Sequence, residues 1–550
     1  MSTDGTNGGK RLDKTVTPTA TNLGQFVATD FIAKDAIPNG SVIVVCDGYQ
    51  YRPEGWQVKG EKNTASRPGN VTEAITVVDD AWWGNFTVRA FNLAYKSNPG
   101  IPVTEMDHVI ASFAIYVPKA DPDPTHIDTA EKLVAFLKAA TAETTTDYIM
   151  TKDVDMKGVT VPTAAGFKGT FDGKGKTIKN LAATAPLFAT LDGTVKDVTL
   201  EGAFTPTGGT FGVLAGTSSG SIEGVTNKAT VTLSAEDLNA ETLIAGIVGN
   251  STGTIKNCTN SGAVTVSSAL SLANVAVAGV VAKASGALET VYNNGDVSVS
   301  TLYCVARPSA TIEANPVFAP CVGGILGIAV SGTTITTGKN TGKVTFIASK
   351  IETLTTANVE RVMIGGVAGA PAGNITSVDN EGDVLVQAIT SDRSAATKGF
   401  ITCVGGISGG DYYAGASQSL TNITNCTNAG KITVDTDASA SNSAIGGIVG
   451  WPGVEGDTQN TLTKNCINKG AVTVSGVGKC RIGGIAGGAG SLEACKNYGK
   501  ITSNLVGASG GTLGGVLGYS AKLVVGTVTN CESYGDVICN DTLNQTSIVR

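Results

Sequence analysis

The chain has 550 residues, a formal net charge of −7 and an isoelectric point near 5.1, a balance that argues against binding to nucleic acid or an anionic membrane. Charged residues make up 15% of it, and its 71 glycines exceed the usual share of about 7%, as is typical of a turn-rich all-β protein. No run of 18 apolar residues occurs, so the sequence predicts no transmembrane helix.

Residues 1–14, rich in Gly and Thr, predict a flexible tether. The sequence contains no recognisable signal peptide. One explanation is that the chain lacks its export signal and a lipid-anchoring cysteine. The alternative is a cytoplasmic protein with a loose terminus.

Residues 15–119 predict a β-sandwich, because short apolar runs alternate with turn clusters. The expected strands cover residues 41–45, 74–78, 85–91 and 109–117. Aromatic residues in the intervening loops are candidate ligand-binding residues: Tyr51, Trp56, Trp82 and Trp83. The alternative is that they close the core, although adjacent Trp82 and Trp83 cannot both point inward from a strand.

Residues 120–210 are expected to contain a linker, a capping helix and the first coils of a solenoid. Ala120–Pro124 reads as the linker, and residues 127–140 predict a helix with Asp128 or Thr129 as N-cap. Leu133, Phe136 and Leu137 lie on one face of this helix. Because a solenoid needs its open end covered, we expect the helix to cap the first coil.

Residues 211–540 contain nine copies of one pattern, followed by a tail at 541–550. Each copy has a GGI-like piece, a segment ending in N-C-x-N-x-G and a V-x-V piece, with 31 to 45 residues between copies. A repeat of this size indicates a stacked array, and its short alternating pieces indicate strands. Three strands per copy, with a return path of strand and turn, predict a right-handed parallel β-helix. The glycine that precedes the apolar residue of GGI lies at Gly212, Gly246, Gly279, Gly324, Gly366, Gly406, Gly447, Gly484 and Gly515.

Equivalent positions in successive copies form columns with distinct chemistry. The residue after that glycine is always Val or Ile, which predicts a buried core column. The asparagine of N-x-G predicts an asparagine ladder at a corner, and the glycine of N-x-G predicts a turn with positive φ. The next column alternates in sign wherever it is charged, which predicts ion pairs between coils. It reads Asp296, Lys343, Asp383, Lys431, Ala471, Lys500 and Asp536.

The pattern Gly-Ile-Val-Gly with GTIKNCTNSGAVTV, from Gly246 onward, resembles the GLUG repeat of bacterial surface proteins. Upstream, Tyr148–Met156 and Phe167–Ile178 resemble the opening coils of pectin-lyase-like β-helices in secreted and surface proteins of Bacteroidetes. The resemblance implies the fold and an outer-membrane or secreted location rather than an activity.

The 11 cysteines predict buried thiols more than disulfides. Five of them, Cys258, Cys426, Cys466, Cys495 and Cys531, share one column with valines, so they replace small apolar residues. Cβ atoms stacked about 4.8 Å apart are farther apart than a disulfide prefers. Cys304 and Cys321 bracket the longest insertion and stay open as a disulfide pair.

Aromatic residues also occur after the GGI pieces, where a ligand would find exposed rings: Tyr412, Tyr413, Trp451 and Tyr519. The alternative is that these rings pack over their own loops. Carboxylates within the repeats are scattered, and both histidines lie outside them, so paired acid/base chemistry and a metal site have little support. A calcium site among loop carboxylates stays open.

The sequence therefore predicts a non-catalytic exported cell-surface protein for adhesion or capture of a glycan or protein ligand, without a cofactor. The alternatives are a polysaccharide lyase or hydrolase built on a β-helix, and a structural surface spacer.

Overall fold

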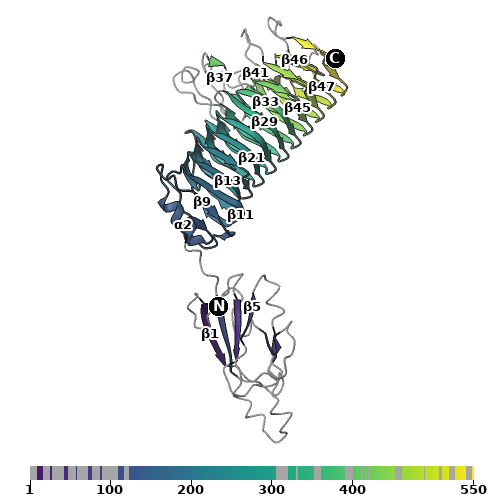
Figure 1. The fold of residues 1–550 in the computed structure, drawn as a ribbon. Coiled ribbons are helices and arrows are strands. Elements are labelled where there is room, and N and C mark those ends of the chain that lie inside the picture. Colours follow the sequence, from purple (N-terminus) through teal and green to yellow (C-terminus); the bar gives the residue numbers. More distant parts are fainter. Residues whose placement is uncertain are drawn as a thin grey trace. The chain divides into compact units, whose positions relative to one another are not determined.

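The computed structural model divides the chain into two compact units, Met1–Pro122 and Asp123–Arg550 (Figure 1). In the first unit it describes the backbone of the strands named below. In the second it describes residues 123–304, 320–329, 332–351, 361–389, 401–410, 421–451, 461–488, 490–506, 511–519 and 527–540, and the backbone of three short strands outside these ranges. For 438–442 and a few residues at the range ends only the backbone is described.

The first unit contains two antiparallel sheets. One has the order β1 (Gly9–Thr15), β7 (Ile110–Tyr116), β3 (Val42–Asp47) and β5 (Thr72–Thr76). The other has the order β2 (Gln25–Val27), β6 (Thr87–Arg89) and β4 (Gln57–Val58). The four expected strands overlap β3, β5, β6 and β7. β1 begins at Gly9, inside the residues expected to form a tether, and pairs with β7 along its whole length.

The second unit is a parallel β-helix in which each coil pairs with the coil before and after it. It opens with β8 (His126–Ile127), β9 (Tyr148–Met150), β10 (Val154–Asp155), β11 (Thr170–Ala183) and β13 (Thr194–Phe204). A complete coil has four strands. The chain turns a corner at the first two residues of the GGI-like piece, which are called the glycine pair below, and the return path from V-x-V is itself a strand.

The strands of equivalent coils stack in four sets. Those before the glycine pair are β14 (Thr210–Gly212), β19 (Thr242–Ala245), β23 (Val275–Ala278), β27 (Cys321–Gly323), β31 (Arg361–Gly365), β35 (Ile401–Gly405), β49 (Thr512–Gly514) and β53 (Ile548–Val549). Those after it form a separate sheet of β12 (Phe188–Leu191), β15 (Ala215–Ser218), β20 (Val248–Ser251), β24 (Val281–Ala284), β28 (Leu326–Ala329), β32 (Ala368–Ala370), β36 (Ser408–Gly410) and β42 (Val449–Trp451).

The other two sets carry the asparagine and V-x-V patterns. The first comprises β16 (Ser221–Glu223), β17 (Thr226–Asn227), β21 (Thr254–Asn260), β25 (Ala287–Asn293), β29 (Thr333–Asn340), β33 (Gly373–Asn380), β39 (Asn422–Thr424), β40 (Thr427–Asn428), β43 (Leu462–Lys464), β44 (Ile467–Asn468), β46 (Ser491–Glu493), β47 (Lys496–Asn497), β50 (Val528–Thr529) and β51 (Glu532–Ser533). The second comprises β18 (Thr230–Leu238), β22 (Val264–Leu272), β26 (Val297–Cys304), β30 (Val344–Ile351), β34 (Val384–Ala388), β41 (Ile432–Gly446), β45 (Val472–Gly483), β48 (Ile501–Val506) and β52 (Val537–Cys539). β41 and β45 continue into the next glycine pair.

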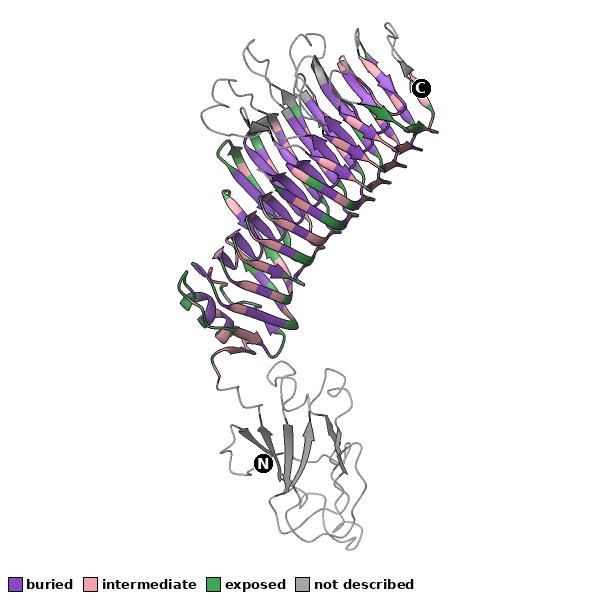
Figure 2. Cartoon of the chain, turned by 45° about the horizontal axis from the view of Figure 1, so that its top comes forward, coloured by how far each residue is buried: buried purple, intermediate pink, exposed green. Residues whose placement is uncertain are grey.

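The interior is a continuous apolar core, visible as the buried residues along the coils in Figure 2. The predicted core column after the glycine pair is confirmed, because its first eight members, such as Ile247 and Ile448, have no exposed surface. β-Branched side chains suit this stack, since their restricted rotamers cost little to order in a strand.

The predicted asparagine ladder is confirmed along eight coils. In each step one Nδ2 donates to the Oδ1 of the next asparagine, as from Asn293 to Asn340 at 2.7 Å and from Asn340 to Asn380 at 2.8 Å. The same Nδ2 also donates to the carbonyl two residues on, as from Asn340 to Gly342 at 2.8 Å. The eight asparagines are fully buried, and the ladder ends where Asn497 meets the Ser533 hydroxyl at 3.2 Å.

The positive φ predicted at the glycine of N-x-G is wrong. Positive φ occurs instead one residue before the cysteine column, as at Asn257 (φ 53°) and Asn465 (φ 53°). The glycine is needed for close packing, because a Cβ at Gly342 would lie 2.0 Å from the Gly295 carbonyl oxygen of the preceding coil. The first asparagine of N-C-x-N therefore supplies the left-handed corner, which its residue type tolerates.

The ion pairs predicted in the column after N-x-G are wrong in their partner. Asp296 Oδ1 accepts the backbone N–H of Lys343 at 2.8 Å, and Asp383 Oδ1 accepts that of Lys431 at 2.9 Å. The aspartate side chain is short, so its carboxylate reaches the backbone N–H of the next coil more readily than it reaches the flexible lysine ammonium there. Column alignment itself is confirmed by the backbone hydrogen bond from Val297 to the Lys343 carbonyl.

The predicted capping helix is α2 (Ala130–Ala139), with Thr129 as its N-cap. Leu133, Phe136 and Leu137 are buried, and the Phe136 ring stacks on Phe171 at 5.5 Å. The helix thus covers the apolar end of the first coils. No helix in the described part of the chain is long and apolar enough to span a membrane.

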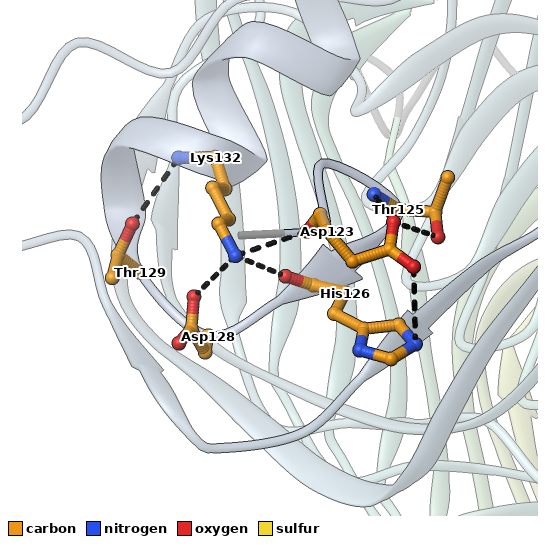
Figure 3. A network of polar contacts seen from close by, with 6 residues as sticks. All are labelled: Asp123, Thr125, His126, Asp128, Thr129 and Lys132. Atoms are coloured by element: carbon orange, nitrogen blue, oxygen red, sulfur yellow. Dashed lines mark hydrogen bonds and ion pairs between the residues drawn. The ribbon is translucent and has the colours of Figure 1, made fainter. Parts of the chain in front are cut away.

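A polar network ties α2 to the segment that precedes it (Figure 3). Lys132 Nζ donates to the carbonyls of Asp123 at 3.1 Å and His126 at 2.9 Å, and pairs with Asp128 Oδ1 at 3.0 Å. Thr125 donates from its backbone N to Asp123 Oδ1 at 2.8 Å. Asp128 therefore holds Lys132 and does not serve as the N-cap.

The last described coil, residues 527–540, is the least buried coil in Figure 2. Val528 is 44% exposed although it pairs in register with the fully buried Leu492. Cys531 and Val537 are half-buried. The core positions of this coil are therefore more exposed than those of the coil before it.

Candidate ligand-binding surface

One of the aromatic residues predicted to bind a ligand, Trp451, is buried. Trp451 ends β42 and retains 9% of its surface, inside a second apolar cluster that also contains Met363 and Cys403. Its ring lies over Gly488, where a Cβ would come within 2.5 Å of the indole. The absence of a side chain at Gly488 therefore lets Trp451 fold down onto the next coil.

Tyr519 lies in the same column as Trp451, and Arg481 lies between the two rings. The guanidinium carbon is 4.6 Å from the Trp451 ring centroid and 3.6 Å from that of Tyr519. Such cation–π contacts stabilise packing, and they cover ring faces that a sugar would need. The expectation of open stacking faces is therefore wrong for Trp451, while half-buried Tyr519 has Arg481 over its ring.

The other predicted binding residues are not tested by the structure. Tyr412 lies outside the described residues, and only the backbone of Tyr413 is described, in β37 (Tyr413–Ala414), which pairs with β38 (Ser417–Gln418). The rings of the first unit also lie outside the described residues: Tyr51, Trp56, Trp82 and Trp83. The side chain of Cys304 is likewise not described, so its pairing with Cys321 stays open.

Sequence reasoning missed an exposed aromatic pair, Tyr498 and Tyr534, in the last two described coils. Tyr498 is 48% exposed and Tyr534 is 60% exposed. Their ring centroids are 5.0 Å apart and the ring planes differ by 9°, so they stack along the axis of the coils. Both occupy the middle position of the N-x-G corner, where the seven earlier copies carry polar or small residues. Comparing this column would have found them.

Polar contacts fix the orientation of the tyrosine pair. The Tyr534 hydroxyl donates to the Glu532 carboxylate, which also pairs with Lys496 Nζ at 3.3 Å. The Tyr534 hydrogen bond, followed by Lys496, lowers the pKa of Glu532, and the same hydrogen bond raises the pKa of Tyr534. A tyrosine held in one orientation loses little conformational entropy when a ligand stacks on it.

Three lysines near Tyr498 are available to an anion. Lys469 precedes Tyr498 in the corner column, and Lys500 follows it two residues later in the same coil. Lys431 and Lys500 share a column in which Ala471 stands between them. In the described part of the chain none of these three ammonium groups forms an ion pair, in contrast to Lys496.

Carboxylates on the first coils are held in the ionised form. A backbone hydrogen bond from Thr177 lowers the pKa of Asp153. Burial alone would raise the pKa of Asp172, but contacts with Lys174 at 2.9 Å and Lys196 at 3.2 Å outweigh it and lower that pKa. A general acid for glycoside cleavage needs the opposite shift. Among the described residues no three His, Cys, Asp or Glu side chains form a group suited to a metal ion.

The cysteine column consists of thiols, as predicted. Cys258, Cys426, Cys466 and Cys495 are buried and unbridged. Each donates to the carbonyl two residues before it, as from Cys258 Sγ to the Lys256 oxygen at 3.1 Å. Burial raises the pKa of Cys258 to about 12, so this thiol stays protonated and unreactive at neutral pH.

No family model matches the chain. A curated relative, Halomucin from Haloquadratum walsbyi, is 31% identical over 194 residues, which cover 31% of this chain and 2% of that protein. The chain thus spans a small fraction of the length of this relative.

Two solved structures are also similar. One is a Bacteroides ovatus protein proposed to be an immunoglobulin A1 protease, with 17% identity, a TM-score of 0.35 and coverage of 59% of this chain and 83% of that one. The other is an IgA1 protease, with 13% identity, a TM-score of 0.37 and coverage of 78% and 29%. At this level of similarity neither structure bears on the activity of this chain.

Proposed function

We propose that this protein is an exported surface protein that captures a glycan ligand on its β-helix without cleaving it. The observation that carries the proposal is the exposed stacked pair Tyr498 and Tyr534. Rigid, solvent-exposed tyrosine rings offer apolar surface to the C–H faces of a pyranose, and the area removed from water supplies affinity. A protein ligand that presents a flat apolar group is the alternative occupant.

The state of the carboxylates supports binding rather than cleavage. The pKa of Asp153 and that of Asp172 are both lowered, so neither side chain is suited to donate a proton to a leaving group at neutral pH. The continuous buried core supports a rigid platform, since each coil is hydrogen-bonded to its neighbours along several strands.

The proposal extends to location and domain structure. The repeats are of the GLUG type, the two antiparallel sheets of the first unit pack as a β-sandwich, and the protein is anchored to an outer membrane by a lipid. Similarity to Halomucin and the resemblance of the repeats to surface proteins support a location outside the cell. Extracting native cells with detergent and labelling them with a lipid precursor would test the anchor.

A glycan array probed with the full chain tests the proposed function. We expect binding to a defined class of glycans and loss of that binding in Tyr498→Ala/Tyr534→Ala. Lys228→Ala is the matched control, because Lys228 occupies the same corner column far from the pair and is engaged with Glu201 at 3.0 Å. Absence of binding to any glycan would contradict the proposal and favour a spacer.

The chain length of the bound glycan separates capture from cleavage. After prolonged incubation with the protein, we expect size-exclusion chromatography to return the glycan unchanged. A shift to shorter products that is absent from a heat-inactivated sample would identify an enzyme instead.

A further inference from the structure

We propose, resting on the proposed glycan-binding function, that the ligand is an acidic glycan whose sugar carboxylate binds Lys469 and Lys500 while a pyranose stacks on the tyrosine pair. These four residues, Lys469, Tyr498, Lys500 and Tyr534, are called the tyrosine–lysine corner below. The corner spans three successive coils, with Lys469 on the first, Tyr498 and Lys500 on the second and Tyr534 on the third.

Both rings of the tyrosine pair are exposed, Tyr498 by 48% and Tyr534 by 60%. Tyr534 stacks on Tyr498 through one face, so the exposed area of the two side chains is left for a ligand. A pyranose can therefore pack against this ring surface beside Lys500, which shares a coil with Tyr498. The Glu532 carboxylate, which holds the Tyr534 hydroxyl, keeps this ring in place.

The charge cluster is unusual for this protein, whose net charge is −7. Several lysines on the same surface are neutralised, as Lys339 is by Glu381 at 2.8 Å and Lys464 by Glu493 at 2.7 Å. Lys469 and Lys500 have no such partner in the described residues, and Ala471 occupies the position where an acidic residue would separate Lys431 from Lys500. The corner therefore carries uncompensated positive charge.

The acidic groups beside the corner do not cancel this charge. Glu532 is engaged by Lys496 at 3.3 Å and by Tyr534. Asp536 follows Lys500 in the column, yet the two side chains form no ion pair. An anionic ligand can satisfy Lys469 and Lys500 without displacing an existing pair, so the carboxylate adds affinity that a neutral sugar lacks.

Matched pairs of glycans test this inference with the full chain: sialyllactose against lactose, and hyaluronan oligosaccharide against its carboxyl-reduced form. We expect the carboxylated member of each pair to bind at least about tenfold more tightly at low salt, with the difference shrinking as ionic strength rises. Affinity is measured by isothermal titration calorimetry.

Three variants assign the contacts. Lys469→Ala/Lys500→Ala should abolish the preference for the carboxylated member and leave binding of the neutral member unchanged. Tyr534→Ala should weaken both members alike. Lys343→Ala is the control, because Lys343 shares the column of Lys500 but lies in a coil whose corner residue is Thr341. All four substituted residues are exposed, and unchanged thermal unfolding verifies that each variant folds.

The outcomes separate the two proposals. Equal affinity for acidic and neutral members, or a preference that survives Lys469→Ala/Lys500→Ala, overturns the inference and leaves glycan capture standing. Binding to no glycan overturns both. Binding only to a protein ligand at this corner also overturns the inference.

Discussion

The first coils of the β-helix and its last described coil both place apolar residues at core positions, but these residues differ in their exposure to solvent. At the first coils α2 buries Phe136 against Phe171, Phe167 and Phe188, whereas in the last described coil Val528 is 44% exposed. Leu492, the register partner of Val528, is fully buried one coil earlier. What a column residue contributes to stability therefore depends on whether something covers its coil, and the pairs of variants below test this dependence.

Phe136→Ala is expected to have the largest effect. Removing a buried ring that contacts four others leaves a cavity, so the free energy of unfolding of the β-helix should fall by about 3–5 kcal/mol. Val528→Ala, at the other end, should cost less than about 1 kcal/mol, because the side chain is largely hydrated already. Denaturant titration compares the two, and similar losses would contradict the comparison.

Asn340→Ala should have the next largest effect. It leaves the Asn380 oxygen and one Asn293 N–H without their buried partners, at about 1–3 kcal/mol for each group. Ser533→Ala, at the end of the ladder, removes a single partly exposed contact with Asn497 and should cost less. If both variants unfold at the same denaturant concentration, the interior and terminal positions of the ladder contribute equally to stability, which would contradict the prediction.

A pH dependence follows from the buried thiol of Cys258. Because burial raises the pKa of Cys258 from about 9 to about 12, its contribution to stability is complete below pH 9 and is lost as pH rises toward 12. The loss should be about 1.4 kcal/mol per pH unit in that window, as the unfolded thiol ionises and the folded one does not.

Cys258→Val should remove this slope, and valine already occupies the column in other coils, for example at Val291. Val291→Ala, in the same column of the next coil, is the control and should keep the slope, because it removes apolar contacts without removing a thiol. Free energies of unfolding measured at pH 8, 9.5 and 11 test the prediction, and equal slopes in wild type and Cys258→Val would refute it.

Glu532→Gln should have the smallest effect, confined to the exposed end. Global stability should not change measurably, because Glu532 and Tyr534 are exposed and Lys496 is half-buried. The pKa of Tyr534 should move down toward its ordinary value, because the hydrogen bond to the Glu532 carboxylate raises it most and an uncharged amide is a weaker acceptor. Ultraviolet titration of the tyrosines detects this shift, with Tyr534→Phe identifying the signal.

Much of the β-helix could be predicted from the sequence because its columns repeat the same physical requirement in every coil. The Val/Ile column, the asparagine ladder, the cysteine column and α2 all follow from residue type at a fixed spacing. The positive φ was assigned to the wrong residue because Gly342 and Asn257 both permit turns, and only the distance between backbones shows that Gly342 is required for close approach.

The candidate site was harder to predict because burial of an aromatic residue depends on its neighbours. Trp451 reads as an exposed loop residue, yet Gly488 and Arg481 in the next coil make room for it and cover it. In the sequence, Tyr498 occupies the variable position between Asn497 and Gly499. Its role in an exposed aromatic pair becomes apparent only in the structure, where Tyr534 stacks on it. The exposure of both residues depends on contacts between coils, which the sequence of a single copy does not show.

The constant register of the coils has a consequence for how such a protein can be altered. Gly279 and Gly324 are 45 residues apart and Gly484 and Gly515 only 31, yet Ala278 pairs with Gly323 and Gly483 with Gly514 at the same position of the coil. Sequence added between strands leaves the hydrogen bonds of the array untouched, and doubling a loop costs only about 0.6 kcal/mol in closure entropy. The array therefore accommodates copies of unequal length, and residues inserted between two strands are expected to leave the register of the coils unchanged.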